Sequence, residues 1–243
     1  NIPLHDYIPR TIQEKYQFLP KNIAIKEMHN PTSTLNYRKA KQRLKYEEIF
    51  LYLLKIQYLK KRRETEEKAM MRNISYQEVE NFISTLPFEL TKDQMETVKS
   101  IFKDLTTQKR MNRFVQGDVG SGKTIVAFLA AYMNFLSKHQ TALMVPTEIL
   151  AVQHYQNAKE VFKEIKINIG LLTSSVSKKE RENTYQKLEN GELDFIIGTQ
   201  SLIQDNLHFS NLGLIIADEQ HRFGVKQREL LRNKGISPDV LSM

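Results

Sequence analysis

The stretch Gly117-Asp118-Val119-Gly120-Ser121-Gly122-Lys123-Thr124 decides the fold of this chain. Its three glycines let the backbone curl, so that successive N–H groups and the start of the following helix face an anion. This is the P-loop pattern, in which the lysine adds positive charge on nucleotide phosphates and the threonine hydroxyl is a ligand for Mg²⁺. We therefore predict that these eight residues bind a nucleoside triphosphate and that Lys123 is also catalytic. A glycine-rich turn without a ligand is the alternative, which the expected strand before the pattern and helix after it disfavour.

A second motif follows an apolar run at 212–217. It is Asp218-Glu219, which lies 94 residues after Thr124. A buried strand that ends in two acids supplies what a P-loop needs, namely one carboxylate for Mg²⁺ and one to orient and deprotonate the attacking water. We assign Asp218 to the metal, together with Thr124, and Glu219 to the general base. An acid pair by itself would more simply be a polar strand end.

Short apolar runs alternate with amphipathic segments between these two motifs. The expected strands lie at 113–116, 141–145, 167–172, 194–197 and 212–217, and the expected helices at 123–137, 148–164 and 177–190. Such alternation requires right-handed crossovers and predicts an α/β fold, with a mostly parallel sheet and helices on both faces. In sheets of this kind ligands bind at the carboxyl ends of the strands.

Residues 1–75 have a different character and are expected to form a helical linker region before the α/β domain at 76–243. Four of the seven prolines fall within residues 1–35, which predicts short helices and turns. One long helix is expected over 38–71, with its apolar middle, 49–54, packed against a neighbour. Residues 1–75 hold 16 Lys and Arg against 8 Asp and Glu, so they carry the whole net charge of +8.

The composition excludes several classes of protein. There is no cysteine, which removes disulfides and thiolate chemistry and fits a cytoplasmic location. No apolar run approaches the roughly 18 residues that a membrane span needs, so we expect no membrane partner. The basic helix is either a solvated face or a surface that holds duplex DNA by its phosphates. A helix on a membrane surface would also be basic, but these apolar residues form no single face.

Several strings resemble the DExH-type helicases and translocases of superfamily 2. The resembling strings are Pro146-Thr147-Glu148-Ile149-Leu150-Ala151-Val152-Gln153-His154 (their motif Ia), Gly198-Thr199-Gln200-Ser201-Leu202 (motif Ib), and Asp218-Glu219-Gln220-His221-Arg222-Phe223-Gly224-Val225-Lys226-Gln227-Arg228. The last string is very like the RecG branch-migration helicases, as are residues 42–48 and 86–94. The likeness therefore covers nearly the whole chain. One departure is Thr173-Ser174-Ser175, where that family usually has a glycine second.

The resemblance implies the first RecA-like motor domain of an ATP-dependent DNA helicase that remodels stalled forks and Holliday junctions in recombination and repair. Its implied partners are branched or forked DNA, a second RecA-like motor domain and a wedge domain of the same parent chain. The Thr-Ala-Thr motif of the family would begin after Met243, and the arginine finger would lie in the second motor domain. We therefore expect the chain alone to be weakly active or inactive.

The resemblance also implies further contacts. Gln94 would read the adenine edge and Phe88 would stack on the base, with a helix cap at Thr91 and an exposed Gln94 as the alternative. Thr147, Thr199, Lys178 and Lys179 would face the DNA backbone, where the alternative is ordinary helix caps and solvated charges. His221 is expected to couple the nucleotide pocket to the DNA face, and Arg222 and Phe223 to make packing and interdomain contacts. A metal role for His221 is disfavoured because no other histidine stands at ligand spacing.

Two rival functions remain at this point. A double-stranded DNA translocase of the transcription-repair coupling type shares the Arg222-Phe223-Gly224-Val225 string, but typically has Glu-Gln where this chain has Gln220-His221. A P-loop domain that acts as a nucleotide-dependent binding switch, without translocation, would carry the same phosphate-binding residues.

Overall fold

The chain forms two compact units, residues 1–66 and 67–243, in a computed structural model that describes residues 4–66, 71–108, 110–118, 120–219 and 223–243. The second unit begins nine residues before the expected boundary at 76. Part of the reason is Arg72, whose side chain is buried in the second unit. None of the described helices combines the length and the apolar composition that a membrane crossing requires.

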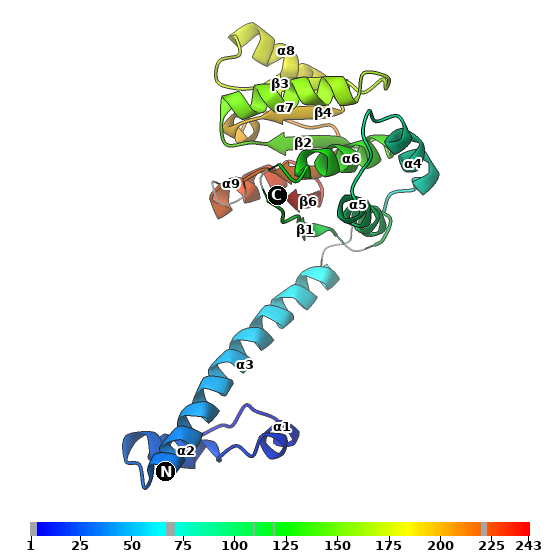
Figure 1. Cartoon of the computed structure of the whole chain (residues 1–243). Helices are drawn as coiled ribbons and strands as arrows, with labels where there is room; N and C mark the ends of the chain where they lie inside the picture. The colour runs from blue at the N-terminus through cyan, green and yellow to red at the C-terminus, as the bar shows by residue number, and fades with distance from the viewer. Residues whose placement is uncertain (1–3, 67–70, 109, 119, 220–222) are drawn as a thin grey trace. The chain divides into compact units, whose positions relative to one another are not determined.

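The first unit consists of helices α1 (Arg10–Lys15), α2 (Lys21–His29) and α3 (Thr34–Glu66) (Figure 1). Prolines 9 and 20 immediately precede α1 and α2, as suits a residue with a fixed φ and no N–H to donate. The side chain of Arg43 is fully buried and pairs with both Asp6 and Glu47. This ion-pair cluster joins the extended N-terminal segment to α3.

The middle of α3 has no described neighbour within the first unit, so the predicted packing is not made inside that unit and stays a prediction beyond it. Ile49, Tyr52, Leu53 and Leu54 each keep at least half of their surface accessible. Among the α3 side chains whose burial is described, the buried ones are Ala40, Arg43 and Glu47, which lie nearer its N-terminal end. An apolar run that surrounds a helix has no single side to bury, and α2 is too short to cover it.

The second unit is a parallel sheet of six described strands. The strands are β1 (Asn112–Phe114), β2 (Gln140–Met144), β3 (Ile169–Leu172), β4 (Phe195–Gly198), β5 (Leu212–Ala217) and β6 (Asp239–Ser242). Their order in the sheet is β1-β6-β5-β2-β4-β3, and every pair is parallel. The α/β fold expected from the alternation is confirmed, although β6 was not expected.

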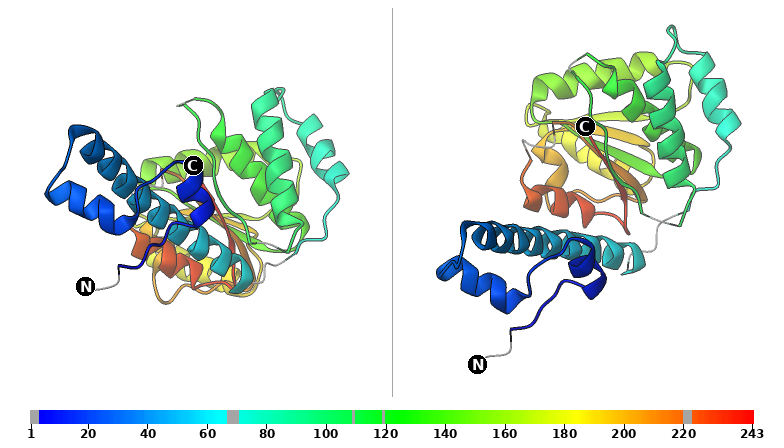
Figure 2. Two further views of the ribbon diagram at one scale, coloured as in Figure 1. Left: turned by 90° about the horizontal axis from the view of Figure 1, so that it is seen from below. Right: turned by 60° about the horizontal axis from the view of Figure 1, so that its bottom comes forward.

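Helices cover both faces of this sheet. They are α4 (Tyr76–Ser84), α5 (Lys92–Leu105), α6 (Lys123–Leu136), α7 (Glu148–Val161), α8 (Lys178–Glu189) and α9 (Val225–Arg232), with a short 3₁₀ helix η1 (Gln200–Ile203). One buried core contains side chains of α4 to α7, and the other contains Leu188 of α8, Leu202 of η1 and Leu231 of α9. In Figure 2 the green helices α5 to α7 and the orange-red α9 accordingly lie on opposite sides of the strands.

The six strands end at one level. Register partners run across the whole sheet through the last residue of each strand, namely Phe114, Ser242, Ala217, Met144, Gly198 and Leu172. All the loops that follow these residues therefore leave from the same edge. This carboxyl edge carries the P-loop after β1, the acid pair after β5, and the expected DNA-facing residues after β2, β3 and β4.

A buried polar network holds the start of the second unit against the sheet. The Arg72 guanidinium pairs with the Asp239 carboxylate, and its Nη2 donates to Asn134 Oδ1 at 2.8 Å and to the Gly213 carbonyl at 2.7 Å. The other Asp239 oxygen accepts from the Met111 N–H. This network joins residue 72 to α6, β5 and β6, so these residues belong to the sheet's own core.

Candidate nucleotide-binding site

The P-loop joins β1 to α6 in the conformation that a phosphate cradle requires. Gly120 and Gly122 have φ of 82° and 78°, a region that favours glycine. At position 122 a side chain would also run into the Gln94 amide. Gly122 is the N-cap of α6 and provides no side-chain cap, so the first N–H groups of a 14-residue helix face the loop. Val119 lies outside the described residues.

Lys123 lies over the loop that precedes it. Its Nζ donates to the Gly117 carbonyl at 2.7 Å and to the Asp118 carbonyl at 2.9 Å. The ammonium group is thereby held against the P-loop backbone, next to the N-terminus of α6. Positive charge from the side chain and from the helix dipole is concentrated at one place.

The acid pair follows β5, whose six residues are all buried. Asp218 Oδ1 accepts from the Glu219 N–H at 2.9 Å, and Oδ2 lies 3.1 Å from Nε2 of His154 on α7. Glu219 has φ of 49°, a left-handed conformation that is uncommon for a residue with a side chain. Backbone strain of this kind is found where a side chain must be aimed at a site.

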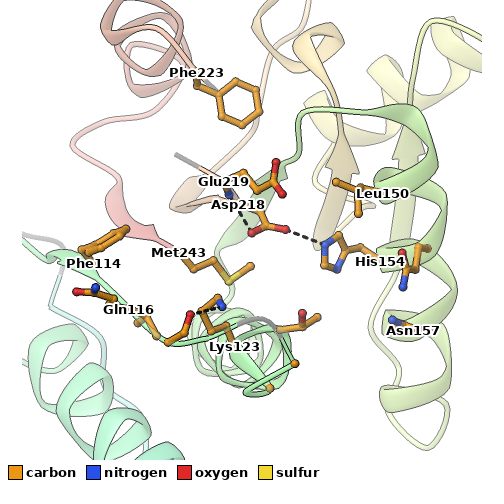
Figure 3. A pocket seen from close by; sticks show the side chains of 16 residues that line it. Phe114, Gln116, Lys123, Leu150, His154, Asn157, Asp218, Glu219, Phe223 and Met243 are labelled. Carbon is orange, nitrogen blue, oxygen red and sulfur yellow. Dashed lines mark hydrogen bonds and ion pairs between the residues drawn. The ribbon is translucent and has the colours of Figure 1, made fainter. Parts of the chain in front are cut away.

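The P-loop and the acid pair line one pocket with a volume of about 1080 Å³ (Figure 3). Lys123 lies on one side of it and Asp218 and Glu219 on the other. Apolar side chains of Phe114, Leu150, Phe223 and Met243 complete the wall. A space that is positive on one side and acidic on the other suits a triphosphate with its divalent cation and attacking water.

Thr124 and Asp218 both line this pocket and offer hard oxygen ligands, which fit Mg²⁺. Among the described residues, no three acidic, histidine or cysteine side chains form a complete metal site. A magnesium ion here would therefore need phosphate oxygens and water as its remaining ligands, which is how Mg²⁺ commonly binds with nucleotides.

A second pocket of about 590 Å³ adjoins the first and shares Gly122, Thr124 and Asn157 with it. Phe88 and Gln94 both line it. Gln94 closes a capping box at the start of α5, with Oε1 accepting from the Thr91 N–H at 2.9 Å. Its Nε2 donates to the Ser121 carbonyl at 2.9 Å. The capping alternative is therefore present, and the same side chain also touches the P-loop.

The four expected DNA-facing residues lie on the carboxyl-edge side of β2, β3 and β4. Thr147 is exposed and caps α7, accepting from the Leu150 N–H at 3.3 Å. Thr199 precedes η1 and makes no side-chain cap. Lys178 and Lys179 begin α8 and are exposed.

Beside these residues, Glu148 joins α7 to the loop after β3. Its Oε1 accepts from the Ser174 N–H at 2.9 Å, and hydrogen bonds from the Ser174 and Ser175 side chains hold the pKa of Glu148 below its ordinary value.

The sequence reasoning missed the contribution of α7 to the main pocket. Leu150, Gln153, His154 and Asn157 all line it. Their spacing of three and four residues places them on one face of the helix, and that spacing was the available signal. Phe223, expected to make packing contacts, is buried beside the pocket. His221 and Arg222 lie outside the described residues.

A glycine-rich loop at a helix start, facing an acid pair across one pocket at the carboxyl edge of a parallel sheet, defines a P-loop NTPase of the RecA-like fold. Residues 91–237 match the family described as DEAD/DEAH box helicase. The chain belongs to this family.

Comparison with individual proteins shows which helicases the chain is similar to. The chain is 43% identical to ATP-dependent DNA helicase RecG of Staphylococcus epidermidis, over 100% of this chain and 36% of that protein. It is 44% identical to ATP-dependent DNA helicase RecG of Bacillus subtilis, over 99% of this chain and 35% of that protein. The solved structure of RecG bound to a three-way DNA junction matches with a TM-score of 0.82 and 43% identity, over 99% of this chain and 32% of that one. The predicted resemblance to RecG is confirmed, and the chain spans about a third of the length of these relatives.

Proposed function

We propose that this chain is the ATP-binding first motor domain of a helicase that remodels branched DNA. The observation that carries the proposal is the convergence of Lys123, Thr124, Asp218 and Glu219 on one pocket. The N–H groups of the P-loop and the Lys123 ammonium would bind the β- and γ-phosphates. Glu219 would orient a water molecule for in-line attack and accept its proton. Mg²⁺, held by Thr124 and Asp218, would supply neutralisation of phosphate charge.

The adjoining pocket would take the adenine. Phe88 is 48% exposed, so its ring is accessible for stacking. Gln94 can donate to a ring nitrogen and accept from the exocyclic amine, provided that it exchanges its bonds to Thr91 and Ser121 for bonds to the base.

Gln94→Ala is expected to weaken ADP binding about tenfold and GDP binding much less, because about 1.4 kcal/mol of hydrogen bonding to adenine would be lost. Gln94→Glu is the matched control for folding, since a glutamate also closes a capping box but cannot donate an amide hydrogen. It should keep the contribution of the capping box to thermal stability, although it loses the donation to the Ser121 carbonyl, and should lose ADP affinity as the alanine variant does. Fluorescence titration with labelled ADP and GDP measures both. Equal losses for the two nucleotides would contradict an adenine contact.

We further propose that the carboxyl edge beyond β2, β4 and β3 faces DNA phosphates through Thr147, Thr199, Lys178 and Lys179. The RecG relative of known structure was bound to a three-way DNA junction. The Lys178 side chain is 91% exposed, with Glu182 as a partner at 4.0 Å, so it is free to reach a backbone. Hydroxyls and lysines at this edge would grip phosphates without reading sequence.

Changing both Lys178 and Lys179 to Glu should weaken DNA binding and lower the slope of log K against log salt by about two, because each phosphate contact contributes about 0.9. Lys166 and Lys187 are exposed and lie at the opposite edge, before β3 and at the end of α8, so their joint change to Glu alters net charge equally and serves as the control. Fluorescence anisotropy across a salt series measures the slopes. Equal effects of the two double variants would show that Lys178 and Lys179 are ordinary solvated charges that make no specific contact with DNA.

The activity on branched DNA, the second motor and wedge domains as partners, and a cytoplasmic location are parts of the same proposal. Its test is a chimera in which this chain replaces the matching 240 residues of the Bacillus subtilis RecG relative. We expect forked DNA to stimulate ATP hydrolysis by the chimera more than linear duplex does, and Lys123→Ala to abolish both. Equal stimulation would favour a translocase of the transcription-repair type. Nucleotide-dependent DNA binding without hydrolysis would favour a binding switch.

A further inference from the structure

His154 is a buried polar side chain at the wall of the nucleotide pocket. It lies two turns into α7, and only 6% of its surface is accessible. Its Nε2 is 3.1 Å from Asp218 Oδ2, and the contact joins α7 to the end of β5 (Figure 3). The imidazole ring also makes an edge-to-face contact with the ring of Phe128 on α6, and the two ring centroids lie 6.4 Å apart. The ring, which projects from α7, is therefore held between Phe128 of α6 and the Asp218 carboxylate.

The chemistry of the contact assigns the hydrogen. An ionised carboxylate can only accept, so His154 Nε2 carries the hydrogen and donates it. His154 Nδ1 is buried and has no hydrogen-bond partner among the described residues. The contact with Asp218 is therefore the hydrogen bond that fixes the orientation of this ring.

Both carboxylate oxygens of Asp218 thus accept a hydrogen bond from the protein. Oδ1 accepts from the Glu219 N–H and Oδ2 accepts from His154. Each carboxylate oxygen has two lone-pair positions, so one on each oxygen remains available. The Glu219 contact comes from the adjacent residue in the chain, whereas the His154 contact comes from 64 residues away and sets the plane of the carboxylate relative to α7.

We propose that His154 is a positioning residue, which orients the Asp218 carboxylate for the divalent cation that accompanies the nucleotide. This rests on the proposed role of Asp218 in the nucleotide site. Hydrogen bonds from outside a metal site orient its carboxylates, and loss of such a partner typically lowers metal affinity 10- to 100-fold. A histidine that only filled the core would have no effect that depends on the cation.

The test is a fluorescence titration of labelled ADP on the 243-residue chain, first without metal and then across a range of MgCl₂ concentrations. The parent should bind ADP more tightly with Mg²⁺, and Asp218→Asn should lose most of that gain. His154→Asn should raise the Mg²⁺ concentration for half-saturation about tenfold, while ADP binding without metal stays within twofold. His154→Gln should restore the parental value to within about threefold, because its amide nitrogen reaches the position of Nε2 and that of asparagine does not.

The Asn and Gln variants both remove the ring from its contact with Phe128, so the difference between them reports the hydrogen bond and not the packing. Circular dichroism checks that both are folded. Equal Mg²⁺ half-saturation in the parent and both variants would overturn the inference and leave the proposed function intact. So would an equal loss of ADP affinity with and without metal. No gain from Mg²⁺ in the parent, or a full gain in Asp218→Asn, would overturn the role of Asp218 and the inference with it.

Discussion

Replacing Glu219 with Gln is expected to slow ATP hydrolysis by the chimera about 10²- to 10⁴-fold, the usual contribution of a general base. The amide keeps the size of the side chain but cannot accept the proton of the attacking water. The contacts assigned to the phosphates come from the P-loop and Lys123, so ATP affinity should change by less than about twofold. Steady-state hydrolysis and fluorescence titration with labelled ATP separate the two effects.

The control for this prediction is Glu229→Gln. Glu229 is exposed on α9, ten residues further along the chain, and its replacement by Gln makes the same change in charge and size. Its rate should match that of the parent. If Glu219→Gln hydrolyses ATP at the parental rate, the general base is another group.

Replacing Arg72 with Met is expected to lower the free energy of unfolding of the second unit by about 3–5 kcal/mol, the typical cost of breaking a buried ion pair. The Asp239 carboxylate would remain buried without its partner, and Asn134 Oδ1 and the Gly213 carbonyl would each lose a donor. Chemical unfolding in urea, followed by circular dichroism, measures the loss.

Two further variants show whether the unpaired buried charge of Asp239 causes the loss of stability in Arg72→Met. Arg113 pairs with Asp104, but both side chains are about one third exposed, so Arg113→Met should cost at most about 1 kcal/mol. The double variant Arg72→Met with Asp239→Asn should be more stable than Arg72→Met alone, because no unpaired charge is then buried. Losses of equal size for Arg72→Met and Arg113→Met would show that the buried pair contributes no more than an exposed one.

The parts of this structure that depend on local pattern could be predicted from the sequence. The strands at 141–145 and 212–217 are short apolar runs, and the P-loop residues between β1 and α6 need particular backbone conformations that glycine permits. The placement of Asp218 at a strand end followed from the same reasoning. These features are determined within about ten residues of chain.

The features that were missed depend on distant partners. β6 has only four residues and begins with the buried Asp239. Its burial is tolerated because it pairs with Arg72, which lies 167 positions earlier in the sequence. His154 was part of a string that resembles a helicase motif, but its contact with Asp218 requires α7 and β5 to be placed together. Gln94 was predicted to read adenine, and its contact with Ser121 depends on how α5 meets the P-loop.

The position of β6 in the sheet has a consequence for the order of folding. β1 lies at the sheet edge and pairs with β6, and β6 in turn pairs with β5. Within the described sheet, the strand that leads into the P-loop and the strand that leads into the acid pair are therefore joined by residues 239–242, more than 120 positions after β1. Pairing such distant segments requires a long loop to close, which slows folding. We therefore expect the alignment of the two sides of the nucleotide pocket to be a slow step in the folding of this domain, and a nucleotide that binds the finished pocket to stabilise the domain after that step.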